Sequence, residues 1–170
     1  MHDRQYGKAV QLAIDLGLGS MGKQLDVATI GEGVPYLAAA AQAFGHRVVA
    51  FTSSDDHVED ATAILGVEHT PITCFSLDGR DPLDSRYWFD LIVCMGSSGI
   101  LSHSTFRRMA RCVWALMRSI RIPTGRVVCA FDPQWAGGRW RLVSRWRRHL
   151  RRVQIRAIDG RIEFIPRGLP

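Results

Sequence analysis

The sequence predicts an α/β fold in which a mostly parallel sheet is covered by helices. Leu25 to Ser54 contains a buried apolar run, a short turn with two glycines, an Ala-rich helix and a second apolar run, which is the pattern of a βαβ unit. Apolar and helical segments keep alternating further along the chain, which is typical of parallel sheets. Two short strands around Asp159-Gly160 predict a closing antiparallel hairpin.

The amino-terminal elements follow from periodicity and from glycine and proline. We expect, in order, an amphipathic helix over 4–16, a flexible Gly-rich connector over 17–23, a strand over 24–30, a helix over 35–44 and a strand over 46–52. Pro35 suits a first helical turn because its missing N–H would be unpaired there anyway. Gly45 ends the helix.

The remaining elements complete a seven-stranded sheet. We expect a helix over 54–65, a strand over 67–75 interrupted by Pro71, a strand over 89–96, a helix over 102–120, a strand over 125–131, an Arg-rich helix over 144–152 and the hairpin over 153–166. One domain over 1–170 is the natural expectation for this length. Within it, 1–21 form the first helix and connector, and 138–170 form the Arg-rich helix and hairpin.

Composition narrows the class of protein. The chain is 46% hydrophobic, yet it contains no apolar run of roughly 20 residues, the length that spans a membrane. The first residues lack the basic-then-apolar pattern of a signal peptide, which favours a cytoplasmic location. The four cysteines form no CxxC pair, so we expect buried, reduced thiols and no metal site.

Positive charge is concentrated near the carboxyl end. Residues 137–170 carry ten arginines and two acidic residues, or +8, so the other residues carry −2 of the total of +6. Arg145, Arg148 and Arg152 share one face of the expected Arg-rich helix. A solvated outer face is the simplest interpretation. An anionic membrane surface and RNA are the alternative partners of this face.

Three segments in succession resemble one enzyme family. They are IGEGVPYLAAAAQAFGHRVVAF, DPLDSRYWFDLIVCMGSSGILSH and RIPTGRVVCAF. They resemble the Gly-rich loop, the fourth strand with its exit, and the turn before the fifth strand of the class I S-adenosylmethionine-dependent methyltransferases. The resemblance covers roughly 22–168. It implies a Rossmann-like, doubly wound, mostly parallel seven-stranded sheet ending in an antiparallel hairpin, and methyl transfer from S-adenosylmethionine.

The resemblance also implies site residues. The acidic position before the first glycine of the family falls on Thr29, with Asp26 as the alternative if the loop is longer. The third glycine falls on Pro35, and the acid that ends the second strand falls on Thr52. The implied donor-binding residues are Thr29, Gly31, Glu32, Gly33, Thr52, Ser53, Asp55, Asp78, Cys94 and Gly96. Candidates for a general base at the exit of the fourth strand are Ser97, Ser98 and His103, and a helix-capping or structural histidine is the alternative interpretation of His103.

The charge of the turn favours a methyl donor over a dinucleotide. A pyrophosphate needs backbone N–H groups at the helix start, whereas Pro35 removes one and Glu32 adds a carboxylate. S-adenosylmethionine instead presents an ammonium and a sulfonium, which Glu32 would attract. The sequence therefore predicts a methyltransferase for a small-molecule or lipid-like acceptor, cytoplasmic or membrane-associated. The alternatives are a catalytically silent binding or scaffold protein of the same fold, and an RNA-directed methyltransferase that uses the basic region.

Overall fold

A computed structural model describes residues 2–20, 22–31, 34–52, 72–74, 88–95, 113–130, 152–158 and 161–167. The chain divides into two compact units, Met1–Ser76 and Leu77–Pro170, and each is described by itself. The described residues include seven strands, the number expected from the sequence. That the two units form one domain stays a prediction.

The first unit is a parallel sheet with two helices. Its elements are α1 (His2–Asp15), β1 (Asp26–Gly31), α2 (Val34–Ala43), β2 (Arg47–Thr52) and β3 (Ile72–Cys74). The strand order is β3-β2-β1, and both ladders are parallel. This is the βαβ arrangement that the sequence predicts for this segment.

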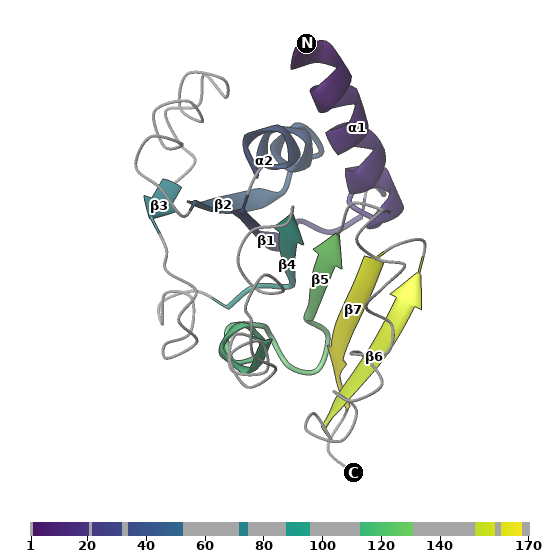
Figure 1. Cartoon of the computed structure of the whole chain (residues 1–170), viewed down its shortest axis with the longest axis vertical. Coiled ribbons are helices and arrows are strands. Elements are labelled where there is room, and N and C mark those ends of the chain that lie inside the picture. Colours follow the sequence, from purple (N-terminus) through teal and green to yellow (C-terminus); the bar gives the residue numbers. More distant parts are fainter. Residues whose placement is uncertain are drawn as a thin grey trace, which may run out of the picture. The chain divides into compact units, whose positions relative to one another are not determined.

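Small apolar side chains let the layers of the first unit pack closely. The middle of β1, residues 27–30, is buried throughout, as expected for a strand covered on both faces. In α2, Leu37, Ala38, Ala40 and Ala41 are fully buried. The helices α1 and α2 lie side by side (Figure 1) and pack against each other. Ala9 and Ala13 of α1 are buried.

Both helices end in the same hydrogen-bonded cap. In α1, the N–H of Gly17 donates to the Ile14 carbonyl at 2.8 Å and the N–H of Leu18 donates to the Ala13 carbonyl at 2.9 Å. This pair of bonds is the Schellman motif, and it places Gly17 at φ 80°, where glycine avoids the strain of a Cβ. Residues 17–20 therefore form a hydrogen-bonded turn, and the flexibility expected for the connector stays a prediction.

The cap of α2 repeats this geometry one helix later. The N–H of Gly45 donates to the Gln42 carbonyl at 2.8 Å, and the N–H of His46 donates to the Ala41 carbonyl at 3.1 Å. Gly45 has φ 87°. The helix therefore ends where the sequence predicts, and the residue after the glycine turns back toward the core.

His46 joins the two caps. Its Nε2 lies 2.8 Å from the Leu18 carbonyl oxygen, and its Nδ1 accepts a hydrogen bond of 3.2 Å from the Leu25 N–H. Only one tautomer satisfies both neighbours: the proton is on Nε2 and Nδ1 is the acceptor. The ring is 7% exposed and links the ends of α1 and α2 to the entry of β1. We call this arrangement the His46 latch.

The second unit is a mixed sheet. Its strands are β4 (Leu91–Met95), β5 (Arg126–Ala130), β6 (Val153–Ile158) and β7 (Arg161–Pro166), in the order β4-β5-β7-β6. The β4–β5 ladder is parallel, whereas β7 runs antiparallel to both β5 and β6. The predicted closing hairpin is therefore present.

The strands of the second unit carry much of its core. Ile92, Val127 and Phe164 are aligned across β4, β5 and β7 and are fully buried. Before β4, Phe89 forms an isolated parallel bridge with Ile120. Residues 113–117 are helical, which agrees with the carboxyl-terminal part of the helix expected over 102–120.

A tight turn leads into β5. The N–H of Gly125 donates to the Arg121 carbonyl at 2.6 Å, and Arg121 also forms an ion pair of 3.1 Å with the buried Asp90. A Cβ on Gly125 would lie 2.7 Å from that carbonyl oxygen and 2.8 Å from the Arg121 nitrogen. Only glycine fits there without backbone movement.

Several predicted elements lie outside the described residues. These are the helix over 54–65, the first part of the helix over 102–120, and all but the last residue of the Arg-rich helix over 144–152. Among the helices that the structure describes, none has both the length and the apolar character needed to cross a membrane.

Candidate functional site

The candidate site is the carboxyl edge of the parallel strands in the first unit. Because β1, β2 and β3 are parallel, their last residues lie at one edge: Gly31, Thr52 and Cys74. The register places Ile30 beside Phe51 and Thr52 beside Cys74. In parallel α/β sheets this edge is where ligands bind.

Gly31 gives the chain a sharp change of direction at this edge. It ends β1 with φ 104°, a conformation that residues with a Cβ rarely adopt. The helix α2 begins three residues later at Val34, with Pro35 in its first turn. The absence of a Cβ at Gly31 also lets a ligand approach the backbone closely.

Thr29 places a hydroxyl group just before this turn. Its side chain is 0% exposed, and the Oγ1 atom has no hydrogen-bond partner among the residues described here. A buried hydroxyl without a partner costs roughly 1–3 kcal/mol, so proteins seldom keep one without a reason. A ligand group that donates a hydrogen bond to Oγ1 would remove this cost.

The alternative placement of the acidic position on Asp26 does not agree with the structure. Asp26 is the first residue of β1, at the opposite end of the strand from Gly31. Its carboxylate forms an ion pair with Arg47, at 2.7 Å to Nε, and Arg47 is its register partner in β2. Thr29 is therefore the residue that lies near the turn.

Some of the other predicted site residues lie in the part of the chain that the structure describes, and the rest lie outside it. Thr52 ends β2 at the candidate edge, and Cys94 is the buried penultimate residue of β4 in the second unit. Arg152 is exposed just before β6. The following predicted residues lie outside the part of the chain that the structure describes: Glu32, Gly33, Ser53, Asp55, Asp78, Gly96, Ser97, Ser98, His103, Arg145 and Arg148.

The described residues were compared with the side-chain groups that bind metal ions in proteins. Within them, no group of three or more His, Cys, Asp or Glu side chains is close enough to hold a metal ion.

No protein-family profile matches the chain, and no curated protein sequence matches it. Solved structures do match over almost the whole chain.

The ribosomal protein L11 methylase of Lactobacillus delbrueckii subsp. bulgaricus is 21% identical, with a TM-score of 0.60; the match covers 94% of this chain and 76% of that one. The N-methyltransferase NodS of Bradyrhizobium japonicum is 12% identical, with a TM-score of 0.63 and coverages of 98% and 97%. A TehB-like S-adenosylmethionine-dependent methyltransferase of Corynebacterium glutamicum is 16% identical, with a TM-score of 0.65 and coverages of 93% and 87%.

The chain has the methyltransferase fold. The predicted fold class, Rossmann-like with parallel strands and a closing antiparallel hairpin, is confirmed by these neighbours. At these identities the likeness establishes the fold, and the activity has to be argued from the site.

Sequence reasoning missed the contribution of His46. The segment 46–52 is predicted as a strand, with no special role for its first residue. Its position gave part of the signal, because the residue directly after a helix-ending glycine turns back toward the helix in a Schellman motif, but nothing in the sequence marks Leu18 or Leu25 as its partners. The latch holds α1, α2 and the entry of β1 together, at the edge of the unit opposite Gly31.

Proposed function

We propose that this protein is an S-adenosylmethionine-dependent methyltransferase that acts on a small-molecule or lipid-like acceptor. The observation that carries the proposal is the β1–α2 turn, where Gly31 has φ 104° and the buried Thr29 hydroxyl lacks a partner among the described residues. The donor would supply a methyl group on a sulfonium, ready for displacement. The protein would supply the position and the surroundings.

The residues at the turn fit such a donor. Thr29 Oγ1 can accept a hydrogen bond, which an ammonium group can donate. Glu32 follows Gly31 directly in the sequence and adds a negative charge to the same turn. A cation is therefore favoured here over a phosphate, and Gly31 leaves room for the donor against the backbone.

Ligands of structural neighbours support the same donor. An amino pentose methyltransferase from Micromonospora echinaspora was solved with S-adenosylmethionine, and the glycopeptide N-methyltransferase MtfA with S-adenosyl-L-homocysteine. This chain spans 52% of the length of the first of these and 90% of the second. Both bind the donor or its demethylated product on the fold that this chain shares.

The neighbours also suggest which acceptors to test first. The amino pentose enzyme, a sugar N-methyltransferase from Streptoalloteichus and MtfA all act on sugars or glycopeptides. This chain spans 52% and 47% of the lengths of the first two, so their acceptor-binding parts need not have counterparts here. An amino sugar, a glycopeptide and a phospholipid form a suitable first panel for methyl transfer.

Calorimetry on Thr29 variants tests the proposal. Thr29→Val keeps the shape of the side chain and removes the hydroxyl. Because the hydroxyl lacks a described partner, the free energy of unfolding should stay the same or rise slightly. Affinity for S-adenosyl-L-homocysteine should fall about tenfold, since a hydrogen bond to a charged group contributes roughly 1.5–3 kcal/mol.

Thr29→Ser is the matched control, because it retains the hydroxyl. It should bind the product as the parent does. Absence of binding heat with the parent protein, at millimolar donor and product, would overturn the proposal and favour the silent binding or scaffold protein. Equal affinity of the Val, Ser and parent proteins would remove Thr29 from the donor site.

A second variant addresses the charge of the turn. Glu32→Lys replaces a carboxylate with an ammonium near the cationic donor. Two unit charges about 4 Å apart interact by roughly 4 kcal/mol at an effective dielectric of 20, so donor affinity should fall at least about tenfold. Glu32→Gln only neutralises the charge, so its donor affinity should lie between those of the parent and of Glu32→Lys. Unchanged affinity in both variants would show that Glu32 faces solvent.

A further inference from the structure

Two buried cysteines lie directly opposite one another in the second unit. Cys94 of β4 is the register partner of Cys129 of β5, in a parallel ladder. Both are reduced and buried, with exposures of 7% and 0%. Register partners on neighbouring strands point to the same face of a sheet, so the two thiols share one side of this ladder.

The spacing of the strands brings the two residues within reach of a bond. Neighbouring strands lie about 4.7–4.9 Å apart, and disulfides form between Cα atoms roughly 4.4–6.8 Å apart. The Cβ atoms of a disulfide need to approach to about 3.5–4.5 Å, so bond formation would draw the ends of β4 and β5 together. A disulfide made under such strain is readily reduced, which suits reversible chemistry rather than a permanent crosslink.

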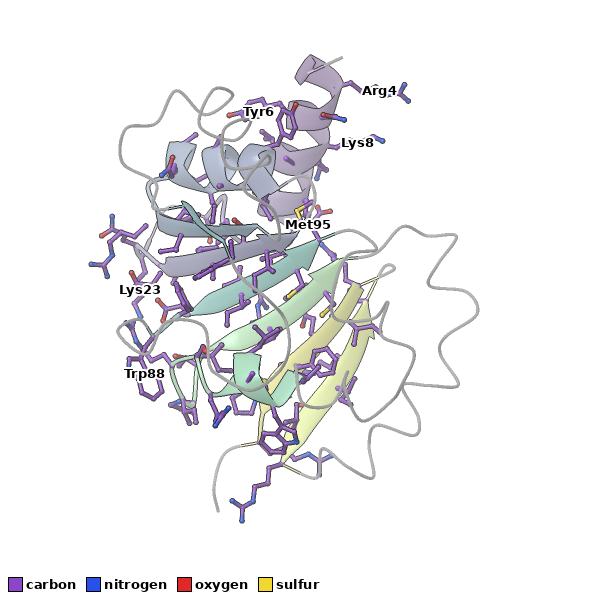
Figure 2. All side chains as sticks on the ribbon, turned by 60° about the vertical axis from the view of Figure 1, so that its left-hand side comes forward. Arg4, Tyr6, Lys8, Lys23, Trp88 and Met95 are labelled. Atoms are coloured by element: carbon purple, nitrogen blue, oxygen red, sulfur yellow. The ribbon has the colours of Figure 1, made fainter. Side chains whose placement is uncertain are left out.

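The pair lies at the edge of the apolar core rather than at its centre. One row further in, Ile92, Val127 and Phe164 are all fully buried. In the row of the cysteines, Ile162 of β7 pairs with Cys129 and is half-buried, and Cys94 retains slight exposure. The next residue of β4, Met95, is half-buried at the carboxyl end of the strand, where Figure 2 shows it. Of the two thiols, Cys94 is therefore the one that retains exposure to a small oxidant.

We propose that Cys94 and Cys129 are a reversible thiol–disulfide pair that responds to peroxide. The thiolate of Cys94 attacks the peroxide oxygen and becomes a sulfenic acid, releasing water after proton transfer. The thiol of Cys129 then attacks that sulfur, loses its proton and displaces a second water molecule. In total, two thiols and one hydrogen peroxide give one disulfide and two waters, and a dithiol reductant reverses the change.

The regulatory consequence rests on the proposed function. Cys94 precedes Met95 at the end of β4. The carboxyl end of such a strand is where an α/β enzyme binds its ligand. Cys94 is among the donor-binding residues that the family resemblance implies, so drawing β4 toward β5 should make the oxidised protein bind the methyl donor several-fold more weakly than the reduced protein.

Mass spectrometry tests the pair without any activity assay. In a protein carrying Cys74→Ala and Cys112→Ala, only Cys94 and Cys129 remain. Peroxide treatment should lower the intact mass by about 2 Da, block alkylation after unfolding and yield one crosslinked peptide pair, all reversed by dithiothreitol. Cys129→Ser should instead leave a sulfenic acid on Cys94 that dimedone captures.

Two other results overturn the proposal. Complete alkylation of both thiols after oxidation would show that no bond forms. Addition of oxygen atoms to each thiol separately would show that they oxidise independently. Calorimetry of reduced and oxidised protein with S-adenosyl-L-homocysteine then tests the consequence, and equal affinities would refute it. Absence of binding by the reduced protein would instead refute the proposed function, while the mass measurement still decides the pair.

Discussion

The contributions of the two hydrogen bonds of the His46 ring to stability can be measured separately. Replacing His46 by Phe preserves the ring shape and removes both nitrogens. The Leu18 carbonyl then loses a buried bond of 2.8 Å, and the Leu25 N–H loses a part-buried bond of 3.2 Å. Each bond contributes about 1 kcal/mol net, and a buried group left unpaired costs roughly 1–3 kcal/mol. The free energy of unfolding should fall by about 2–4 kcal/mol.

Two further variants divide this loss. Asn at position 46 places a carbonyl oxygen near the former Nδ1, so the bond from Leu25 can persist. Gln places an amide nitrogen near the former Nε2, so the bond to Leu18 can persist. Because the Leu18 bond is the buried one, Gln should be less damaging than Asn.

Urea unfolding monitored by circular dichroism measures these differences. A thermal scan gives a second measure. For a protein of this size, 1 kcal/mol corresponds to roughly 2–4 °C, so His46→Phe should lower the melting temperature by about 5–15 °C. Nitrogen chemical shifts of the ring report the tautomer independently, and should show the proton on Nε2. A Phe variant as stable as the parent, or a proton on Nδ1, would refute the latch.

Three further predictions concern other parts of the chain. Gly7→Ala should raise the free energy of unfolding by about 1 kcal/mol in denaturant titrations, because the position is inside α1 and a Cβ meets nothing within 4 Å; a loss of stability would contradict the placement of this helix. Gly125→Ala should lower it by about 1–3 kcal/mol, because its Cβ would lie 2.7 Å from a backbone oxygen that cannot move freely; an unchanged melting temperature would mean that the turn relaxes. Replacing Arg145, Arg148 and Arg152 together by Gln should weaken retention on anionic liposomes or RNA at low salt and leave folding unchanged, whereas equal retention by variant and parent would assign this face to solvent.

The strands and helices with strong local signals were predictable from the sequence. The apolar runs of β1, β2, β4 and β5 leave no solvent face, which is typical of parallel strands. Glycine at the end of α2 and proline in its first turn mark the limits of that helix to within a residue. The closing hairpin follows from Asp159-Gly160 between two alternating segments.

What could not be predicted depends on contacts between distant residues. The segment after α1 contains three glycines, and only the structure shows that its first residues form a cap in which Leu18 is buried. The partner of His46 is 28 residues away, so no local pattern reveals it. For the same reason the register that places Cys94 opposite Cys129 becomes visible only once β4 and β5 are paired.

The candidate site was predicted more by position than by chemistry. Sequence spacing locates the turn after β1, because a glycine between a buried strand and a helix marks it. That the Thr29 hydroxyl lacks a partner among the described residues has no sequence signal, since whether Oγ1 finds a partner depends on every neighbour of the strand. The choice between Thr29 and Asp26 likewise required the ion pair with Arg47.

His46 caps α2 with its backbone N–H and bonds the cap of α1 with its ring, and this has a consequence for the motions of the first unit. Helix ends normally fray separately, and each exchanges its amide protons at its own rate. Here the backbone at Leu18 cannot leave its position without also releasing the ring of His46, which is itself part of the α2 cap. The last turns of α1 and α2 should therefore open as one cooperative segment, with matched protection of Gly17, Leu18, Gly45 and His46 in hydrogen exchange.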